Sequence, residues 1–277
     1  MKDYQVLTFR LQPLEPFREV LLAWLDQMGY EGFEETPEGL KAYVATEAFS
    51  EEELQSLPLF SAPGLSIEYE REDLERINWN EAWERAYAPV RIDDKLLIRA
   101  PFHPEEEGFA HRLVIEPKMS FGTGHHPTTR LMVRAMWPLP WQGRSVLDMG
   151  SGTGVLAILA ALLGAAEVTA IDNFDWAVEN TRENAERNGF PQMEVRRGEV
   201  DLLAGRKWEI ILANINRNVL AADLPHYVEA LEPEGYLLLS GFMQADAEGL
   251  ISQAEALGLR LHDQAAAGDW LCLTYQK

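Results

Sequence analysis

The sequence predicts a two-domain α/β protein, in which a small α+β domain precedes a doubly wound, mostly parallel sheet. The chain has 277 residues, more than a single domain usually contains. Its first 70 residues follow the order β-α-β-β-α-β, and from Ser145 onward strands and helices alternate. We therefore expect a first domain at residues 1–70, a helical linker at 71–88 and a second domain at 89–277.

The first domain shows clear strand and helix signals. Apolar residues at helical spacing over Pro13–Met28 indicate a helix, and Ser50 begins a shorter one in which Glu53 completes a capping box. Four segments have the pattern of strands: Tyr4–Leu11, Gly32–Glu35, Leu40–Thr46 and Leu65–Tyr69. The resulting order is the split ferredoxin-like pattern. The linker helix is expected at Glu72–Ala88, where Trp79 and Trp83 would share one face; packing between domains is favoured for this pair over stacking on a ligand.

The second domain is predicted from repeated strand-helix units. Short strands are expected within Pro89–Pro101 and at Leu113–Ile115. The sheet strands are expected at Ser145–Asp148, Val168–Ile171, Met193–Val195, Glu209–Leu212 and Tyr236–Ser240, and the helices at Val155–Leu163, Asp175–Asn188, Arg217–Leu231 and Ala245–Leu257. Such units predict a parallel Rossmann-like sheet, and two closing strands, Leu259–Asp263 and Trp270–Tyr275, predict an antiparallel addition at its edge.

Composition favours a soluble protein of a reducing compartment. Hydrophobic residues make up 47% of the chain and charged residues 25%. No apolar run approaches the ~18 residues that a bilayer span needs, and no signal-peptide core is visible. The single cysteine, Cys272, has no partner for an internal disulfide. We therefore expect a cytoplasmic protein without a membrane partner.

The charge is strongly negative and unevenly distributed. Lys and Arg number 24 against 45 Asp and Glu, a net charge of −21, which disfavours direct binding to nucleic acid. Residues 1–75 alone hold 5 basic and 17 acidic residues, a net charge of −12. This acidity is either a solvated surface or a docking surface for a basic partner.

A glycine-rich loop and a strand-end acid indicate a nucleoside site. The loop Asp148-Met149-Gly150-Ser151-Gly152-Thr153-Gly154 joins a strand to a helix N-terminus, where a ligand can lie against bare backbone. A dinucleotide fingerprint would need Gly or Ala where Val155 stands. Asp172, at the end of the next strand, is placed to accept ribose hydroxyls. A helix N-cap role is the alternative for Asp172, although Asp175 is better placed for it.

These features together resemble the class I methyltransferases, which use S-adenosylmethionine. Two further segments narrow the resemblance: Glu116–Thr129, which has the pattern E-P-x-M-x-F-G-T-G-x-H-x-T-T, and Leu212-Ala213-Asn214-Ile215 at the end of the fourth strand. With the domain order, they resemble the PrmA family of bacterial ribosomal protein L11 methyltransferases. The resemblance implies that residues 1–70 form the substrate-recognition domain and residues 89–277 the catalytic domain that binds the cofactor. The resemblance implies S-adenosylmethionine as cofactor and, as its binding residues, Thr129, Gly150, Gly152, Asp172, Asn214 and Phe121.

The resemblance also implies the acceptor, which is an amino group of the ribosomal protein on a lysine side chain or at the N-terminus. Asn214 is the expected catalytic residue, because its side-chain oxygen can accept N–H bonds of the incoming amine, as can the backbone carbonyl that follows it. No residue stands out as a dedicated general base, and loss of the proton to solvent before attack is the alternative. Asn214-Ile215-Asn216-Arg217 lacks the N-P-P-Y/F motif of methyltransferases that act on adenine or glutamine amides. A methyltransferase for a small molecule or another protein is the alternative. A dehydrogenase is disfavoured by Val155, and a noncatalytic adenosine-binding module would not explain Asn214.

Two adjacent histidines, His125 and His126, do not predict a metal site. No Cys or acidic residue nearby offers further ligands at a familiar spacing. We expect them to shape the loop that covers the cofactor, and we expect no metal.

Overall fold

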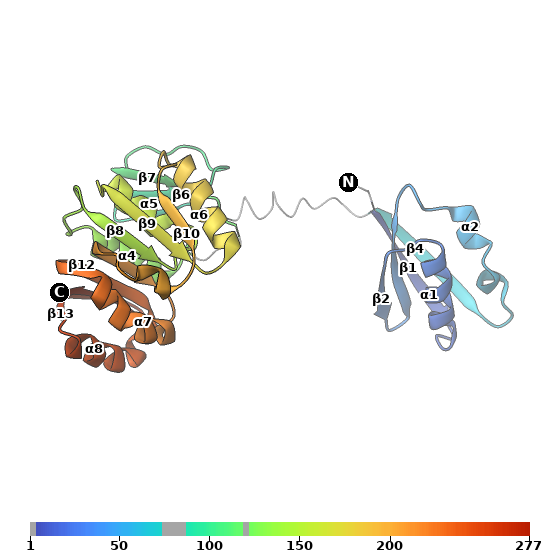
Figure 1. Ribbon diagram of the computed structural model, residues 1–277. Helices are drawn as coiled ribbons and strands as arrows, with labels where there is room; N and C mark the ends of the chain where they lie inside the picture. Colours follow the sequence, from blue (N-terminus) through green and yellow to red (C-terminus); the bar gives the residue numbers. More distant parts are fainter. Residues whose placement is uncertain (1–3, 74–86, 119–121) are drawn as a thin grey trace. The chain divides into compact units, whose positions relative to one another are not determined.

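The computed structural model describes residues 4–73, 87–118 and 122–277, and the chain divides into two compact units, Met1–Arg85 and Ala86–Lys277 (Figure 1). Trp79, Trp83 and Phe121 lie outside the described residues, as does most of the predicted linker helix. The described ends of that helix are not helical. Glu72 and Asp73 continue a strand, and Tyr87 and Ala88 form no regular element.

The N-terminal unit has the predicted ferredoxin-like topology. Its strands are β1 (Tyr4–Gln12), β2 (Gly32–Thr36), β3 (Gly39–Ala45) and β4 (Ser66–Asp73), and its helices are α1 (Phe17–Gln27), α2 (Glu51–Gln55) and the 3₁₀ turn η1 (Pro58–Ser61). The sheet order is β2-β3-β1-β4 with every neighbouring pair antiparallel. At the start of α2, the amide of Glu53 donates to Ser50 Oγ at 3.3 Å, which is the Ser50 half of the predicted capping box.

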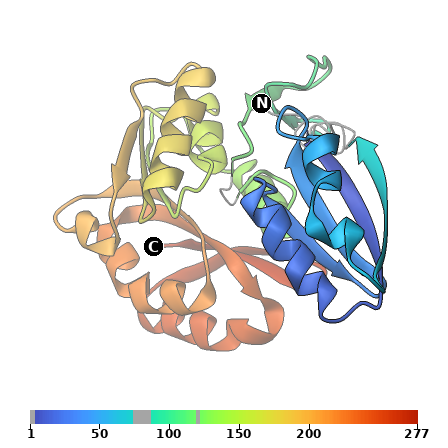
Figure 2. The ribbon, with the colours of Figure 1, turned by 90° about the vertical axis from the view of Figure 1, so that its right-hand side faces the viewer.

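One face of this sheet carries both helices, as Figure 2 shows. Leu7 and Phe9 of β1 point to this face and pack with Leu21 and Leu25 of α1. Because side chains alternate along a strand, the neighbouring residues of β1 point to the opposite face. The small core is therefore closed by α1, α2 and η1 on one side only.

The second unit contains the predicted doubly wound sheet. Its seven strands are β8 (Ser145–Met149), β9 (Glu167–Asp172), β10 (Glu194–Arg197), β11 (Trp208–Asn214), β12 (Leu231–Met243), β13 (Arg260–Ala267) and β14 (Trp270–Gln276). They lie in the order β10-β9-β8-β11-β12-β14-β13. The first five are parallel, and β14 runs antiparallel to both of its neighbours. The closing strands thus form the antiparallel addition expected from the sequence.

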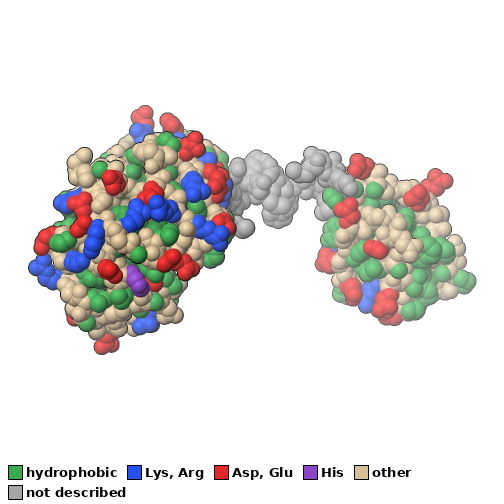
Figure 3. All heavy atoms as spheres, viewed as in Figure 1, with side chains coloured by type: hydrophobic (Ala, Val, Ile, Leu, Met, Phe, Trp, Pro, Cys, Tyr) green, Lys and Arg blue, Asp and Glu red, His purple; other side chains and the backbone are tan. Residues whose placement is uncertain are grey.

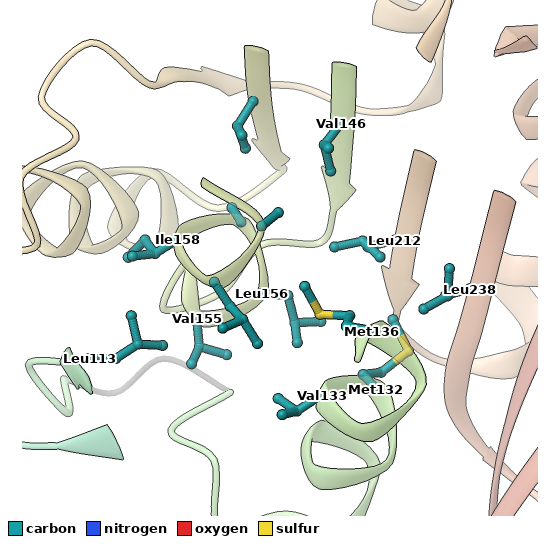
Figure 4. Packing of buried hydrophobic residues seen from close by; sticks show 14 of the residues in the cluster. Leu113, Met132, Val133, Met136, Val146, Val155, Leu156, Ile158, Leu212 and Leu238 are labelled. Carbon is teal, nitrogen blue, oxygen red and sulfur yellow. The ribbon is translucent and has the colours of Figure 1, made fainter. Parts of the chain in front are cut away.

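Helices cover both faces of this sheet and produce two separate cores. The helices are α4 (Pro127–Met136), α5 (Val155–Leu162), α6 (Asp175–Arg187), α7 (Arg217–Ala230) and α8 (Ala247–Ala256), with short 3₁₀ turns at Val200–Leu203 and Gln244–Asp246. Val146 of β8 points into the core formed with α4, α5 and α6, part of which appears in Figure 4. The next residue, Leu147, points into the core formed with α7 and α8. This alternation is the reason that the strands are apolar throughout.

A third, small sheet precedes the main one. It consists of β5 (Val90–Ile92), β6 (Leu96–Arg99) and β7 (His111–Val114) in that order, and its apolar side chains join the core under α4 and α5. Across the described ranges, every helix is too short or too polar to span a bilayer.

Candidate functional site

A cavity of about 860 Å³ opens where β8, β9 and β11 end. In a doubly wound sheet, the carboxyl ends of the strands are the usual place for a ligand. The lining of the cavity includes five of the six residues predicted to bind a cofactor: Thr129, Gly150, Gly152, Asp172 and Asn214. The sixth, Phe121, lies outside the described residues, but its neighbour Gly122 lines the cavity.

The glycine loop between β8 and α5 requires glycine for its shape. Gly150 has φ of 78°, in the left-handed region that side chains disfavour. A Cβ added there would lie only 2.2 Å from Ile215 Cγ2. Any larger residue would therefore displace Ile215, the neighbour of Asn214. The glycine loop therefore packs directly against Ile215, the residue that follows β11.

Asp172 connects the end of β9 to the glycine loop. Its side chain is 7% exposed, and Oδ2 accepts a hydrogen bond from the amide of Gly152 at 2.9 Å. Oδ1 accepts from the amide of Phe174 at 3.1 Å. A carboxylate has about four acceptor positions, so two backbone amides leave capacity for a ligand. The carboxylate therefore both fixes the loop and faces the cavity.

The alternative cap of α6 by Asp175 is wrong. The N-cap position belongs to Phe174, which provides no side-chain cap. Asp175 is the first helical residue, and its exposed carboxylate pairs with Arg197 at 2.9 Å. The amide of Phe174, the N-cap residue, donates to Asp172 Oδ1.

Two buried oxygen atoms at the cavity have no partner within the described chain. They are Asn214 Oδ1, at the end of β11, and Thr129 Oγ1, in the first turn of α4. Buried polar atoms in proteins are almost always hydrogen-bonded, because an unpaired one costs about 1–3 kcal/mol. Since both residues line the same cavity, a polar ligand bound there is the candidate partner for each atom.

Asp148, at the start of the glycine loop, is the most deeply buried acid of the site. It is 1% exposed, and Oδ2 accepts from the amide of Ala157 at 3.1 Å. Burial raises the pKa of this carboxyl to about 7; the bond from Ala157 opposes the rise, and the charge of Asp172 adds to it. Asp148 lines the cavity but is absent from the predicted binding set.

Replacing Asp148 by asparagine should change how stability depends on pH. The pKa of the folded state, about 7, lies above the ordinary value of 3.8, so the folded protein holds an extra proton between these pH values. The free energy of unfolding therefore falls as pH rises through this window, by at most ~1.4 kcal/mol per pH unit. In thermal unfolding from pH 5 to pH 8, the stability of Asp148→Asn should therefore rise relative to that of the wild type. Asp175→Asn is the control. A stability difference between Asp148→Asn and the wild type that does not change with pH would contradict the raised pKa of Asp148.

The two histidines beside the cavity have structural contacts. His126 caps α4, where Nδ1 accepts from the amide of Thr128 at 3.3 Å, and its ring meets Trp270 edge-on with centroids 4.6 Å apart. His125 Nε2 lies 2.9 Å from the carbonyl oxygen of Ala88. Within the described ranges, no three His, Cys, Asp or Glu side chains are grouped as metal ligands.

Several lining residues are absent from the predicted cofactor-binding set. The aromatic ones are Phe174, Trp176 and Trp270, and the acidic ones are Asp148, Glu199 and Asp223. Phe174 and Trp176 are stacked with centroids 5.2 Å apart and remain exposed. Their position directly after the strand-end Asp172 was the available signal. Trp270 enters from the last strand, and no local pattern connects it to the site.

Comparison with known proteins agrees with this architecture. Residues 23–277 match the family model described as ribosomal protein L11 methyltransferase (PrmA). The ribosomal protein L11 methyltransferase of Porphyromonas gingivalis is 44% identical over 265 residues, covering 95% of this chain and 91% of the relative. That of Phocaeicola vulgatus is 38% identical over 276 residues, covering 98% of each. A crystal structure of ribosomal protein L11 methylase from Lactobacillus delbrueckii subsp. bulgaricus shares the fold, with a TM-score of 0.63 and 24% identity over 68% of this chain and 97% of that one. The chain belongs to the PrmA family of ribosomal protein L11 methyltransferases.

Proposed function

We propose that this protein is an S-adenosylmethionine-dependent methyltransferase that modifies amino groups of ribosomal protein L11, on lysine side chains and at the N-terminus. Family membership supports the reaction and the substrate protein. The observation that carries the proposal is the cavity in which the glycine loop, Asp172 and the two unpartnered oxygens of Thr129 and Asn214 come together.

The donor and acceptor groups of this cavity fit the cofactor. Asp172 would accept the ribose hydroxyls, and the backbone of Gly150 and Gly152 would lie against the cofactor. Thr129 Oγ1 would bond to it from α4. When bound, S-adenosylmethionine supplies a methyl group on a sulfonium centre, which is transferred in line to a nucleophile. The protein contributes chiefly position and desolvation.

Asn214 is the residue that would prepare the acceptor. A lysine ammonium has a pKa of ~10.4 and cannot attack while it is protonated. Asn214 Oδ1 would accept an N–H bond of the neutral amine and direct its lone pair. We assign the lost proton to solvent, before the neutral amine attacks.

We further propose that the substrate is held through its basic residues and that the enzyme does not bind nucleic acid directly. The net charge of −12 over residues 1–75 supports both statements, since it attracts lysine-rich proteins and repels phosphates. A cytoplasmic location is proposed on the single cysteine and on the ribosomal substrate.

Incubation with purified L11 and labelled methyl donor tests the function. Mass spectrometry of L11 should show added mass in steps of one methyl group, on lysine residues or at the N-terminus. An Asn214→Ala enzyme is the matched control, since it should retain the cofactor but transfer slowly. Label that appears only on a small molecule would support the alternative acceptor and overturn the proposal.

A further inference from the structure

The cavity at the carboxyl ends of the strands has an acidic lining. Among the described residues no Lys or Arg lines it, and its carboxyl groups are those of Asp148, Asp172, Glu199 and Asp223. The outer surface of the same unit differs, because Lys and Arg side chains lie there among Asp and Glu, as one face shows in Figure 3. A cavity lined in this way favours a ligand that carries positive charge. S-adenosylmethionine is such a ligand, since its sulfonium centre is cationic.

Asp148 and Asp172 are the buried carboxyl groups of this lining, at 1% and 7% exposed. Asp172 accepts hydrogen bonds from two backbone amides, those of Gly152 and Phe174. Asp148 accepts, within the described chain, only from the amide of Ala157. Burial disfavours the charged form of a carboxyl group, and each hydrogen bond donated to it favours that form. The charge of Asp148 is therefore poorly compensated, and burial raises its pKa to about 7.

The elements packed around Asp148 bring few other titratable groups to it. Helix α5 is apolar throughout, from Val155 to Leu162, and β11 is apolar where it pairs with Asp148. On α4, His126 lines the cavity with a pKa that burial lowers, and the two arginines of this helix bond to β5 and to the residue after it. The two remaining acids of the lining come from the segment after β10 and from α7. The charge that acts on Asp148 is that of Asp172.

We propose that Asp148 determines the preference of the enzyme for the charged donor over the neutral product, because it releases its proton when S-adenosylmethionine binds and keeps it when S-adenosylhomocysteine binds. The inference rests on the cofactor of the proposed function and not on its acceptor. The donor has a sulfonium charge, whereas the sulfur of the product is a neutral thioether. A positive charge in the cavity favours the carboxylate form of Asp148, so the proton leaves to solvent. After methyl transfer the carboxylate has lost this countercharge and takes a proton back from solvent.

The direction of the pH dependence follows from this exchange. Below its pKa of about 7, Asp148 holds a proton in the enzyme without ligand, and binding of the donor must displace it. Affinity for S-adenosylmethionine therefore rises with pH and levels off above the pKa. Affinity for S-adenosylhomocysteine has no such contribution from Asp148.

Calorimetric titration of the full-length enzyme tests the inference in the absence of L11. Binding heats measured in two buffers of different ionisation enthalpy give the number of protons released. At pH 6, S-adenosylmethionine should release about 0.9 proton more from the wild type than from Asp148→Asn, because a group with a pKa of about 7 is then about nine tenths protonated. At pH 8.5 the two enzymes should agree. Since both enzymes bind the same ligand and retain His126, its titration and that of the ligand cancel in the comparison.

The ratio of the two affinities gives a second measurement. Between pH 6 and pH 8, the preference for S-adenosylmethionine over S-adenosylhomocysteine should rise about tenfold more in the wild type than in Asp148→Asn, which has no carboxyl group to ionise there. Asp175→Asn is the matched control. It removes an exposed carboxylate that is paired with Arg197, and it should follow the wild type in both measurements.

The other outcomes overturn the inference in distinguishable ways. Equal proton release for donor and product in the wild type would show that the cavity does not respond to the sulfonium charge, and this result does not depend on the folding of a variant. A folded Asp148→Asn enzyme that releases as many protons as the wild type would assign the proton to another group. If L11 receives no methyl group while the binding results hold, the acceptor of the proposed function fails and this inference stands. An enzyme that binds neither ligand would contradict both.

Discussion

Replacing Asp172 by alanine should weaken binding of S-adenosylmethionine at least tenfold. The variant would lack the hydrogen bonds that we propose between the Asp172 carboxylate and the ribose, and bonds to a charged group are worth ~1.5–3 kcal/mol each. The substitution also removes the acceptor for the amide of Gly152, so the glycine loop loses its support from β9. Both effects act in the same direction on affinity. Calorimetric titration with the cofactor measures the loss.

Asp175→Ala is the matched control for this experiment. It removes a carboxylate three residues further on, which is exposed and paired with Arg197 at the surface. Cofactor affinity should be unchanged in this variant. Circular dichroism and thermal unfolding of both variants establish that the sheet persists. Unchanged affinity in a folded Asp172→Ala enzyme would remove Asp172 from the cofactor site.

Replacing Asn214 by alanine should lower kcat about a hundredfold and change cofactor affinity much less. Its oxygen is assigned to the incoming amine, and misplacement of a reacting group by about 1 Å can cost on the order of 10²-fold in rate. An interaction made chiefly with the reacting nucleophile appears in kcat more than in ground-state binding. Single-turnover methylation of L11, together with calorimetry, separates the two quantities.

Asn218→Ala provides the control of the same residue type. Asn218 lines the same cavity but lies exposed at the start of α7. We expect little change in its kcat. Parallel losses in cofactor affinity and kcat for Asn214→Ala would assign Asn214 to the cofactor alone.

Much of the fold follows from local patterns in the chain. The alternation of apolar strands and helices after Ser145 predicted the parallel sheet, and the closing pair predicted its antiparallel edge. Element ends were less accurate. Strand β12 begins at Leu231, directly after α7, whereas the apolar pattern starts only at Tyr236. Pairing of Leu231 with Trp208 across an irregular register extends the strand, and such tertiary pairing leaves no periodic signal.

The lining of the cavity was predictable where its residues lie in contiguous motifs. The glycine loop, Asp172 and Asn214 each end or follow a strand, and parallel strands bring their carboxyl ends together. Trp270 was not predictable in this way, because it reaches the cavity from an antiparallel strand near the end of the chain and packs against His126. The raised pKa of Asp148 could not be predicted from the sequence either, because it results from burial of the carboxyl group beside α5.

The position of the single cysteine has a practical consequence for spectroscopy. Cys272 is 1% exposed within β14, with Sγ 3.6 Å from Met132 Sδ, and burial raises the pKa of its thiol to about 12. Maleimides and similar reagents react with the thiolate, which this thiol does not form near neutral pH. A cysteine introduced on an exposed site of either unit would therefore be the only one to take a fluorophore or spin label. For labelling, the native protein therefore behaves like a cysteine-free protein. One cysteine introduced into each unit would allow the distance between the two units to be measured without first replacing Cys272.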